Sequence, residues 1–475
     1  MAITNITSGL TSFNPVYNPL VYMFDSTNKS NDGFRYIVDI YSAGTSTKIF
    51  EARVAPRPTD GFGYIDVSKV ISDYITYDID VTSTTSIDAI NSHFEYDVKI
   101  GEEFVIDWDV DDTFFQGGVV GAEILVSGGT PNTFATGDQV VISQDVQLIP
   151  ALEGLHTVFS AVTNQSFLVG GVTFIATSAN TGTVRYADNR KTIFRDELEY
   201  TAQTAYNAAF SASEWIDYDS TEYKLQSPST TNKILTNIPD NFRCSESQDL
   251  FVNSSLDSVT GATFFVFEND GGDILFKSAV SNYDINQTAV GPNNLGTLTI
   301  NTGTAPLIKS NTLYYDFSIY EGASAITKTY RVYIDRTCAI EDYEILFLDR
   351  KGSFSSFSFP LRANTNIRGR RTTYNQQIGD VAAGKWTYDR TDSGEVISNV
   401  NISEEITLRT NTITNEMAIY FQELVFSPVT FVKIDGVYHS CVINTNSYSP
   451  QSLKNKKLIR ESVTIRLSNQ NNINI

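Results

Sequence analysis

Alternating apolar and polar residues along most of the chain predict β-strands. Residues 34–41 (FRYIVDIY) are rich in aromatic and β-branched side chains, and residues 48–54 repeat the pattern after a Ser-Ala-Gly turn. Such side chains suit a pleated, half-buried strand, and two such runs joined by turn residues predict a hairpin. Prolines at 56 and 58 end the hairpin, because proline cannot donate to a central ladder.

The same pattern predicts hairpins farther along the chain. Each pairs two apolar runs around Gly, Asp or Asn turn residues, as tight hairpins require. The predicted pairs are 264–267 with 274–276, 314–320 with 329–334, 343–348 with 354–359, and 430–434 with 438–443. A further strand is predicted at 462–467. Asp435-Gly436 is a particularly strong turn signal.

Two stretches break the strand pattern and predict helices. Residues 66–75 place apolar side chains at helical spacing after Asp66, a plausible N-cap. Residues 195–215 contain several alanines and form the strongest helix candidate in the chain.

Length and local composition predict several domains within an all-β fold. A chain of 475 residues is too long for one core. Residues 119–186 are rich in Gly, Val and Thr, with short regular strands that are typical of a small barrel. We expect β-sandwich or immunoglobulin-like units around this inserted barrel, with few short helices. The expected units are 1–118 plus 187–225, the inserted barrel 119–186, a second sandwich 226–340, and a C-terminal unit 341–475 with an extended tail.

Composition points away from an enzyme. The chain has 25 Tyr and 29 Phe but only three each of His, Cys and Met, so residues that commonly carry chemistry are scarce. The net charge of −21 argues against nucleic acid and an anionic membrane surface as partners. The start lacks the features of a secretory signal, and three distant cysteines make no disulfide framework. These features predict folding in a reducing cytoplasm, without membrane insertion.

The most acidic run supplies the only metal candidates that the sequence singles out. Asp107, Asp109 and Asp111 could ligate calcium, but an EF-hand needs Gly at its sixth position and Glu at its twelfth. Asp112 and Gly118 stand there instead, so a solvated edge strand is the main interpretation. His93, His156 and His439 fall in three different expected units and lie near no catalytic signature. We therefore expect no catalytic residues and no cofactor.

Several segments resemble a known group of proteins. They are residues 13–22 (FNPVYNPLVY), 34–40, 61–66 (GFGYID), and Cys338 with 343–354 (YEILFLDRKGSF). These segments resemble virion structural proteins of tailed phages that infect Bacteroides-like bacteria, including the crAss-like group. The stretch from 137–142 to 182–184 resembles small β-barrel modules common in phage tail proteins. The resemblance implies that the protein is located in the virion after assembly in the host cytoplasm. It carries over no catalytic or binding residue.

Three functions remain open from the sequence. The first is an architectural protein of the tail, baseplate or collar, which binds copies of itself and other virion proteins. Sheet edges, aromatic patches, and the terminal arms 1–22 and 469–475 would make these contacts. The second is a receptor- or glycan-binding adhesin that uses aromatic residues of the inserted barrel. The third is a depolymerising hydrolase, which would need a clustered carboxylate pair.

Overall fold

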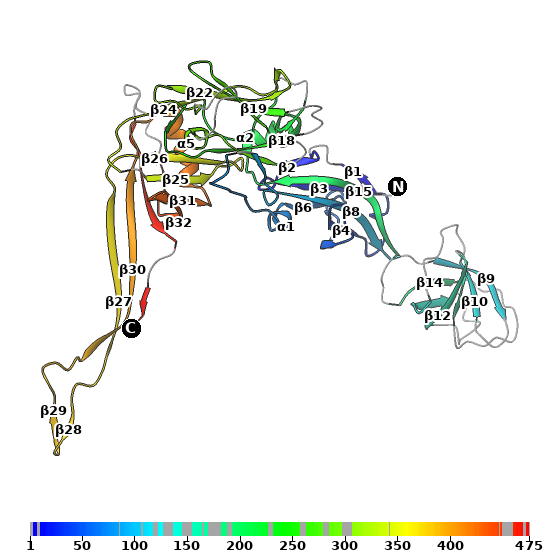
Figure 1. The fold of residues 1–475 in the computed structure, drawn as a ribbon. Helices are drawn as coiled ribbons and strands as arrows, with labels where there is room; N and C mark the ends of the chain where they lie inside the picture. The colour runs from blue at the N-terminus through cyan, green and yellow to red at the C-terminus, as the bar shows by residue number, and fades with distance from the viewer. Residues whose placement is uncertain are drawn as a thin grey trace. The chain divides into compact units, whose positions relative to one another are not determined.

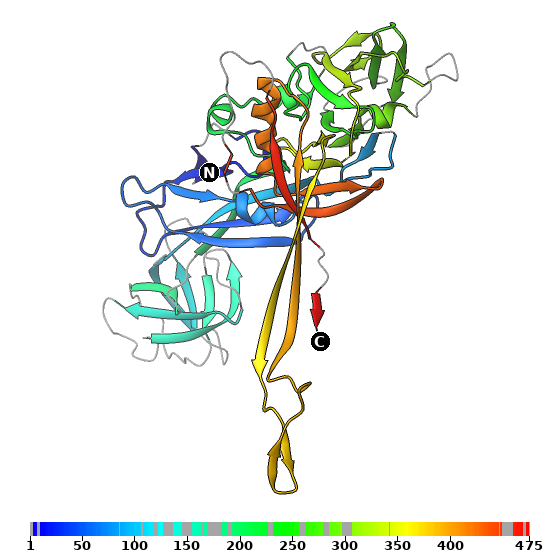
Figure 2. The same cartoon turned by 90° about the vertical axis from the view of Figure 1, so that its left-hand side faces the viewer.

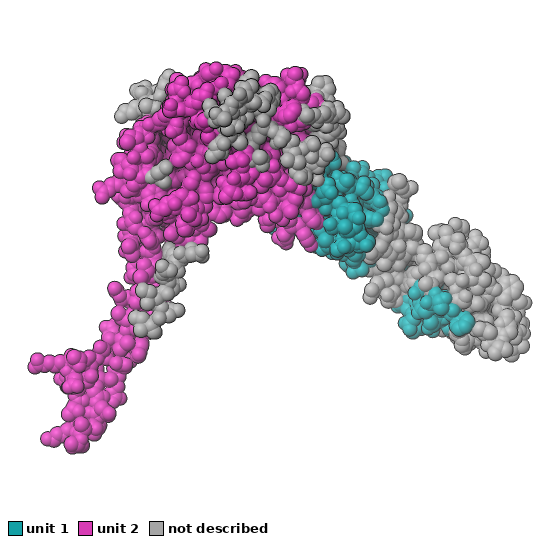
Figure 3. Space-filling view, in the orientation of Figure 1, with its two compact units in different colours: residues 1–14, 19–71, 95–205 teal, residues 15–18, 72–94, 206–475 magenta. Residues whose placement is uncertain are grey.

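The computed structural model confirms an all-β protein. Strands hold 51% of the residues and helices 9%. The chain forms two compact units, unit 1 (1–14, 19–71 and 95–205) and unit 2 (15–18, 72–94 and 206–475), which Figure 3 colours teal and magenta. The structure describes residues 3–6, 10–84, 86–105, 108–116, 122–126, 136–144, 154–163, 166–169, 182–187, 192–226, 231–256, 263–278, 285–296, 306–341, 343–445, 447–448, 459–468 and 472–474.

Unit 1 contains two antiparallel sheets and a barrel. One sheet has the order β1 (Ile3–Asn5), β3 (Val21–Ser26), β6 (Gly63–Asp66). The other has the order β2 (Phe13–Pro15), β15 (Thr192–Tyr206), β8 (His93–Phe104), β4 (Arg35–Ser42), β5 (Lys48–Val54). Tyr22 on β3 and Tyr96 on β8 are fully buried, with their hydroxyls 3.3 Å apart. The hairpin predicted at 34–54 is confirmed by the pairing of β4 with β5.

The inserted barrel is confirmed as a closed, six-stranded structure. Its strand order is β10 (Ala122–Val126), β13 (Ser166–Val169), β12 (Gly154–Thr163), β11 (Gln139–Gln144), β14 (Gly182–Tyr186), β9 (Trp108–Gln116). β9 closes the barrel by pairing with β10 and β14. The barrel therefore begins at Trp108 rather than at 119, because β9 supplies the strand that joins its two edges.

Unit 2 has a 6-stranded and a 12-stranded sheet. The first follows the order β17 (Phe242–Ser245), β24 (Tyr330–Asp335), β22 (Tyr314–Glu321), β19 (Thr263–Asn269), β20 (Ile274–Ser278), with β23 (Ser324–Ala325) beside β22. The second follows β27 (Asn364–Asn375), β30 (Glu395–Arg409), β33 (Ser462–Leu467), β32 (Val437–Ile443), β31 (Thr430–Ile434), β25 (Tyr343–Leu348), β26 (Phe354–Phe359), β18 (Phe251–Leu256), β21 (Asn286–Ala289), β7 (Ser86–Asp88). β16 (Lys224–Leu225) pairs with β18, and β34 (Asn472–Asn474) with β30.

One hydrophobic core joins the two segments that the sequence separated as 226–340 and 341–475. This core contains Phe267 and Phe317 from the 6-stranded sheet and Ile345 and Phe357 from the 12-stranded sheet. The separate C-terminal unit is therefore not observed. Alternation of apolar and polar residues shows which face of a strand is apolar, but not which other sheet covers that face. The sequence therefore predicted 226–340 and 341–475 as separate units.

The helices are short, and one helix prediction was largely wrong. α1 (Ser68–Ser72) lies in the predicted stretch, and the Asp66 carboxylate accepts the backbone N–H of Ser68 at 3.0 Å. Most of 195–215 instead forms β15, and a helix covers only α2 (Ala212–Ile216). Pairing of β15 within the five-stranded sheet outweighs the helix propensity of its alanines. The remaining helices are α3 (Ser220–Tyr223), α4 (Pro292–Gly296) and α5 (Asn415–Val425).

Candidate interaction surface

A long hairpin, here called the arm (residues 364–409), projects from unit 2 (Figures 1 and 2). β27 pairs with β30 along its whole length. Asn364 lies opposite Thr407 at the base and Asn375 opposite Glu395 at the far end, with one register shift after Thr372. Figures 1 and 2 show these two strands leaving the rest of unit 2 as a ribbon that ends in β28 (Asp380–Ala382) and β29 (Lys385–Thr387). Every residue of β27 is exposed. An isolated two-stranded ribbon is only marginally stable in water. The uncovered length of β27 therefore suggests that a partner covers it.

The two faces of the arm differ in chemistry. On one face, Arg368 lies opposite Ser403 and Arg370 opposite Asn401. The other face carries Val400, Ile402, Ile406 and Leu408 of β30, but the exposed Glu404 lies between Ile402 and Ile406, and Arg371 of β27 lies opposite Val400. Ile406 and Leu408 are buried in the core of unit 2, whereas Val400 and Ile402 are only partly covered. Two partly covered apolar side chains, Val400 and Ile402, thus lie beyond the core that covers the base of the arm, and Glu404 separates them from it.

The tip of the arm carries exposed apolar side chains on a tight turn. Ala383 and Gly384 both have positive φ, the conformation of a two-residue turn that matches the twist of a hairpin. Val381, Trp386 and Tyr388 around this turn are exposed. Tryptophan and tyrosine dominate the energetics of protein interfaces, so the tip has the composition of an anchor.

A cavity of about 960 Å³ lies beside α5 within unit 2. Three residues of α5 and its C-cap line this cavity at spacings of three and four, which places them on one helical stripe: Glu416, Ile419, Glu423 and Phe426. Tyr420 and Gln422 of α5 also line the cavity. The opposite side of α5, including Met417, Phe421 and Leu424, is buried in the core. Thr414 caps the helix by accepting the N–H of Met417 at 3.3 Å.

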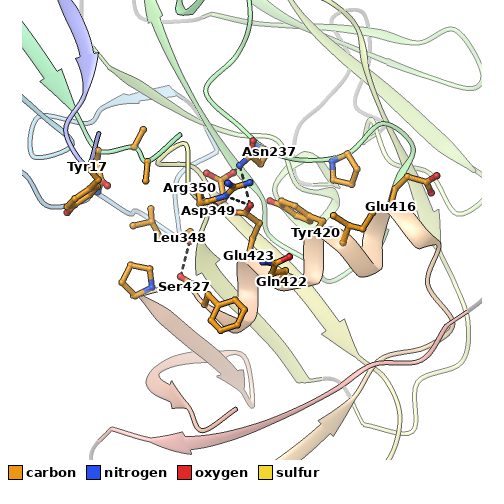
Figure 4. Close-up of a pocket in the computed structure, with 17 residues that line it drawn as sticks. Tyr17, Asn237, Leu348, Asp349, Arg350, Glu416, Tyr420, Gln422, Glu423 and Ser427 are labelled. Carbon is orange, nitrogen blue, oxygen red and sulfur yellow. Dashed lines mark hydrogen bonds and ion pairs between the residues drawn. The ribbon is translucent and has the colours of Figure 1, made fainter. Parts of the chain in front are cut away.

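The rim of this cavity carries exposed apolar side chains beside the exposed polar residues Glu416 and Gln422. Tyr17, Ile419 and Phe426 are 56%, 62% and 55% exposed. Figure 4 shows Tyr17 and the residues of α5 around the same hollow. A contiguous group of exposed apolar side chains around a hollow marks a binding surface, whereas scattered ones are ordinary. This hollow, with its rim, is called the α5 groove below.

A polar network fixes the floor of the α5 groove. The Glu423 carboxylate accepts the backbone N–H of Arg350 at 3.0 Å and also pairs with the Arg350 guanidinium. Asp349 accepts N–H groups from Asn237, Lys351 and Ser353 at 3.1, 2.9 and 3.0 Å. Burial raises the pKa of Asp349 to about 7, against these hydrogen bonds, which lower it. The network satisfies its own members, so the groove offers an occupant mainly its apolar rim.

A second buried polar cluster lies near the start of β25, whereas Asp349 directly follows the end of that strand. Lys433 on β31 lies 2.9 Å from the Asp249 carboxylate and 3.4 Å from that of Glu344 on β25. The Tyr438 hydroxyl donates to Asp249 at 2.7 Å. Burial, and then the neighbouring Asp249 charge, raise the pKa of Glu344 to about 7. Asp249 and Glu344 form a clustered carboxylate pair of the kind that a hydrolase would need. Both carboxylates are only 2% exposed and pair with one lysine, which is typical of a structural ion pair inside the fold.

The metal candidates from the sequence lie largely outside what the structure describes. Asp107 is outside the described residues, and Asp109 and Asp111 lie on β9, of which only the backbone is described. Among described residues, no group of three or more His, Cys, Asp or Glu could hold a metal ion.

The three histidines occupy separate strands. His93 begins β8, with its Nδ1 3.2 Å from the carbonyl oxygen of Ala89. His156 lies on β12, and His439 is exposed on β32. All three cysteines are free, with Cys338 exposed and the other two buried. No described helix is long and apolar enough to cross a bilayer.

Within the terminal segments proposed as arms, the described strands pair inside the chain. Residues 3–5 form β1 on β3, and 13–15 form β2, with Phe13, Leu20 and Tyr22 buried. Residues 472–474 form β34 on β30, so the C-terminus adds a short strand to the arm. The sequence did not single out 364–409, although apolar residues at 400, 402, 406 and 408, interrupted by Glu404, were a signal for an amphipathic strand there.

Comparison with known proteins adds little to this picture. No protein-family model matches the chain. No curated protein matches it either. Among solved structures, it matches one titled "Phage phi92 endosialidase" with 10% sequence identity and a TM-score of 0.19, over 98% of this chain and 68% of that one. At that TM-score the likeness carries no argument about fold or activity.

Proposed function

We propose that this chain is a non-catalytic structural component of a bacteriophage virion, in its tail, baseplate or collar region. It works without a metal or cofactor and assembles as a symmetric oligomer with copies of itself and other virion proteins. The virion location rests on the sequence resemblance at 13–22 and 343–354. The architectural role rests on one structural observation, the uncovered arm of unit 2.

The arm supports assembly because it combines three features that interfaces use. It has an edge strand, β27, at the end of the 12-stranded order, and a sheet edge can pair with another chain. It has two partly covered apolar side chains, Val400 and Ile402, on the same face as the buried Ile406 and Leu408. It has aromatic anchors at its tip. The contacts that the sequence assigned to the terminal segments are therefore assigned to the arm.

Electrostatics also favour the arm as the point of contact. A net charge of −21 makes copies of the chain repel one another. The arm holds six basic and six acidic residues, so it is locally neutral, and β27 alone carries three arginines. Copies therefore approach one another most easily through the arm.

Negative-stain electron microscopy of the full chain tests this proposal. We expect closed particles with a defined symmetry at micromolar concentration. The matched control is an armless variant in which Asn-Gly, a type I′ turn sequence, replaces residues 367–404 and joins the paired residues Asn366 and Glu405. The armless variant should give single particles of monomer size. Closed particles from both proteins, or monomers from both, would contradict the proposal.

A second candidate function is a glycan-binding adhesin, favoured by a polar hollow at the arm tip. This hollow, of about 640 Å³, is lined by amides, carboxylates and one aromatic ring, including Gln376, Asp380, Tyr388, Asp389 and Asp392. Amides and carboxylates can hydrogen-bond sugar hydroxyls, and an exposed ring can stack on a sugar face. Specific binding of the full chain on a glycan array, lost in Tyr388→Ala, would favour this function over architecture.

A further inference from the structure

Charge is distributed unevenly along the arm. Its tip, residues 376–395, holds four acidic and two basic residues, whereas the rest of the arm, 364–375 and 396–409, holds four basic and two acidic ones. Figures 1 and 2 show the tip strands β28 and β29 at the end of the ribbon that lies farthest from the rest of unit 2. The arm is therefore positive toward its base and negative at its tip.

A hollow lined by three arginines lies at the positive end. Arg368, Arg370 and Arg466 surround a space of about 450 Å³, together with Asn401 and Ser403, and no acidic residue lines it. The two β27 arginines lie two residues apart and share a face of the ribbon. No aromatic ring lines the hollow, so it lacks the surface on which a sugar or a base would stack. Protein carboxylates are therefore the anions that suit it best.

These arginines have little compensation within their own chain. The Arg368 guanidinium lies 3.5 Å from the Glu405 carboxylate and its side chain is 67% exposed. Among the residues that the structure describes, Arg370 and Arg466 form no ion pair. Like charges held around one hollow repel one another, and an anion bound between them would relieve the repulsion. This hollow thus favours an occupant with carboxylates.

The tip of the arm carries a hollow of the opposite charge. It measures about 640 Å³ and is lined by Asp380, Asp389 and Asp392, but by no lysine or arginine. Asp380 accepts the backbone N–H of Val381 at 2.7 Å, and Asp392 accepts that of Asp389 at 2.9 Å. Within the described part of the chain, the Asp389 carboxylate has no hydrogen-bond or ion-pair partner. A guanidinium can satisfy such a carboxylate with two parallel hydrogen bonds.

Alternation along the strands places both hollows on one face of the arm. Alternate residues of β27 share a face, so Tyr374 lies on the face of Arg368 and Arg370. The register shift after Thr372 adds a residue to β30 and leaves the alternation of β27 unbroken. Val396 lies opposite Tyr374 and lines the acidic hollow. The face that carries arginines near the base therefore carries carboxylates at the tip.

We propose that the arms of two copies pack face to face in opposite directions, so that Arg370 of each copy pairs with Asp389 of the other. The inference rests on the proposed architectural function and names the surface through which copies meet. The contact is isologous, because a two-fold axis repeats each ion pair. The axis passes midway between the two hollows, near Tyr374, which is 51% exposed. The opposite face, with Val400 and Ile402, stays available for a second contact between copies.

Charge reversal in the full chain tests the ion pair. Arg370→Glu and Asp389→Arg should each weaken self-association by about tenfold or more, because each sets like charges against one another. Both changes in one chain should restore association to within about threefold, since a glutamate again meets an arginine. The matched control is Arg243→Glu, exposed on β17 outside the arm, which should change association by less than about twofold. A double variant as weak as the two single effects multiplied would overturn the inference.

Disulfide trapping gives an independent readout of the two-fold axis. Cys338, the exposed cysteine, is first replaced by Ser. Tyr374→Cys should then form covalent dimers, and no higher species, in oxidised glutathione, because the residue meets its own copy at the axis. The matched control is Asn364→Cys on the same strand and face, ten residues or about 33 Å from the axis. Covalent dimers from both variants, or from neither, would overturn the arrangement.

These variants also separate the inference from the function on which it rests. If both charge reversals leave association unchanged while the armless variant is monomeric, the arm joins copies through another contact. The architectural role would then stand and this inference would fail. If the armless variant assembles as the full chain does, both proposals fail.

Discussion

Ile402 and Ile406 offer a matched comparison of the two roles assigned to the apolar face of β30. They are the same residue type, four positions apart on one strand and on the same face. Ile406 is 5% exposed and belongs to the core of unit 2, where it lies opposite Ile465. Ile402 lies farther along the arm, opposite Gly369, and is only partly covered. Ile406 should therefore stabilise the monomer, and Ile402 the assembly.

The structure sets the size of each effect. Ile406→Ala removes buried methyl and methylene groups and leaves a cavity, at a cost of about 2–5 kcal/mol. In a unit of this size that lowers the melting temperature by roughly 3–8 °C. Ile402→Ala empties no closed cavity and should cost the monomer less than about 1 kcal/mol. It should instead weaken self-association by about fivefold or more, because it removes part of the contact face.

Thermal unfolding at concentrations below association, and light scattering above it, measure the two effects separately. Ile406→Ala should shift the melting temperature and Ile402→Ala the association constant. The reasoning would be refuted if Ile402→Ala destabilised the monomer as strongly as Ile406→Ala and left association unchanged. The apolar face of the arm would then be covered by its own chain.

Three further predictions concern the fold that holds the groove. Gly352→Ala should lower the free energy of unfolding in urea by at least about 2 kcal/mol more than Gly322→Ala does. Both glycines have positive φ, but only at Gly352 would a Cβ lie 2.2 Å from a backbone oxygen. Equal losses of stability in the two variants would contradict this prediction. Asp349→Asn should destabilise unit 2 by about 1–3 kcal/mol, because an amide cannot accept all the N–H groups that the carboxylate accepts, and an unchanged urea midpoint would show that the network is dispensable. Because burial raises the pKa of both Asp349 and Glu344 to about 7, the folded state holds protons that the unfolded state has lost between about pH 4 and pH 7. Stability should therefore fall as pH rises through this window and level off above it, with a smaller slope in Glu344→Gln, and a rising curve would contradict these shifts.

Local signals in the sequence predicted the strands and turns well. Asp435 and Gly436 both adopt the positive φ expected of a tight hairpin turn between β31 and β32. The barrel strands were predicted because short apolar runs alternate with Gly and Thr. The boundary at 119 missed β9, because the pairing that closes a barrel is not visible in one strand alone.

The candidate surface was harder to predict, for physical reasons. The α5 groove combines residues near positions 17, 208, 239, 349 and 419, which only tertiary packing brings together. The arm is exposed because no other part of the described chain packs on β27. A sequence shows that a strand face is apolar, but not whether the protein core or a partner covers that face. Helix α5 was within reach, because Thr414 and the apolar residues 417, 420, 421 and 424 form a capped amphipathic pattern.

Light scattering after size exclusion, across a range of concentrations, tests most directly whether this chain assembles through its arm. The full chain should give a mass of two or more whole multiples of 52.7 kDa, the mass of one chain. The armless variant should remain a folded monomer at every concentration. An armless variant with the same copy number as the full chain, or a full chain that stays monomeric throughout, would contradict assembly through the arm.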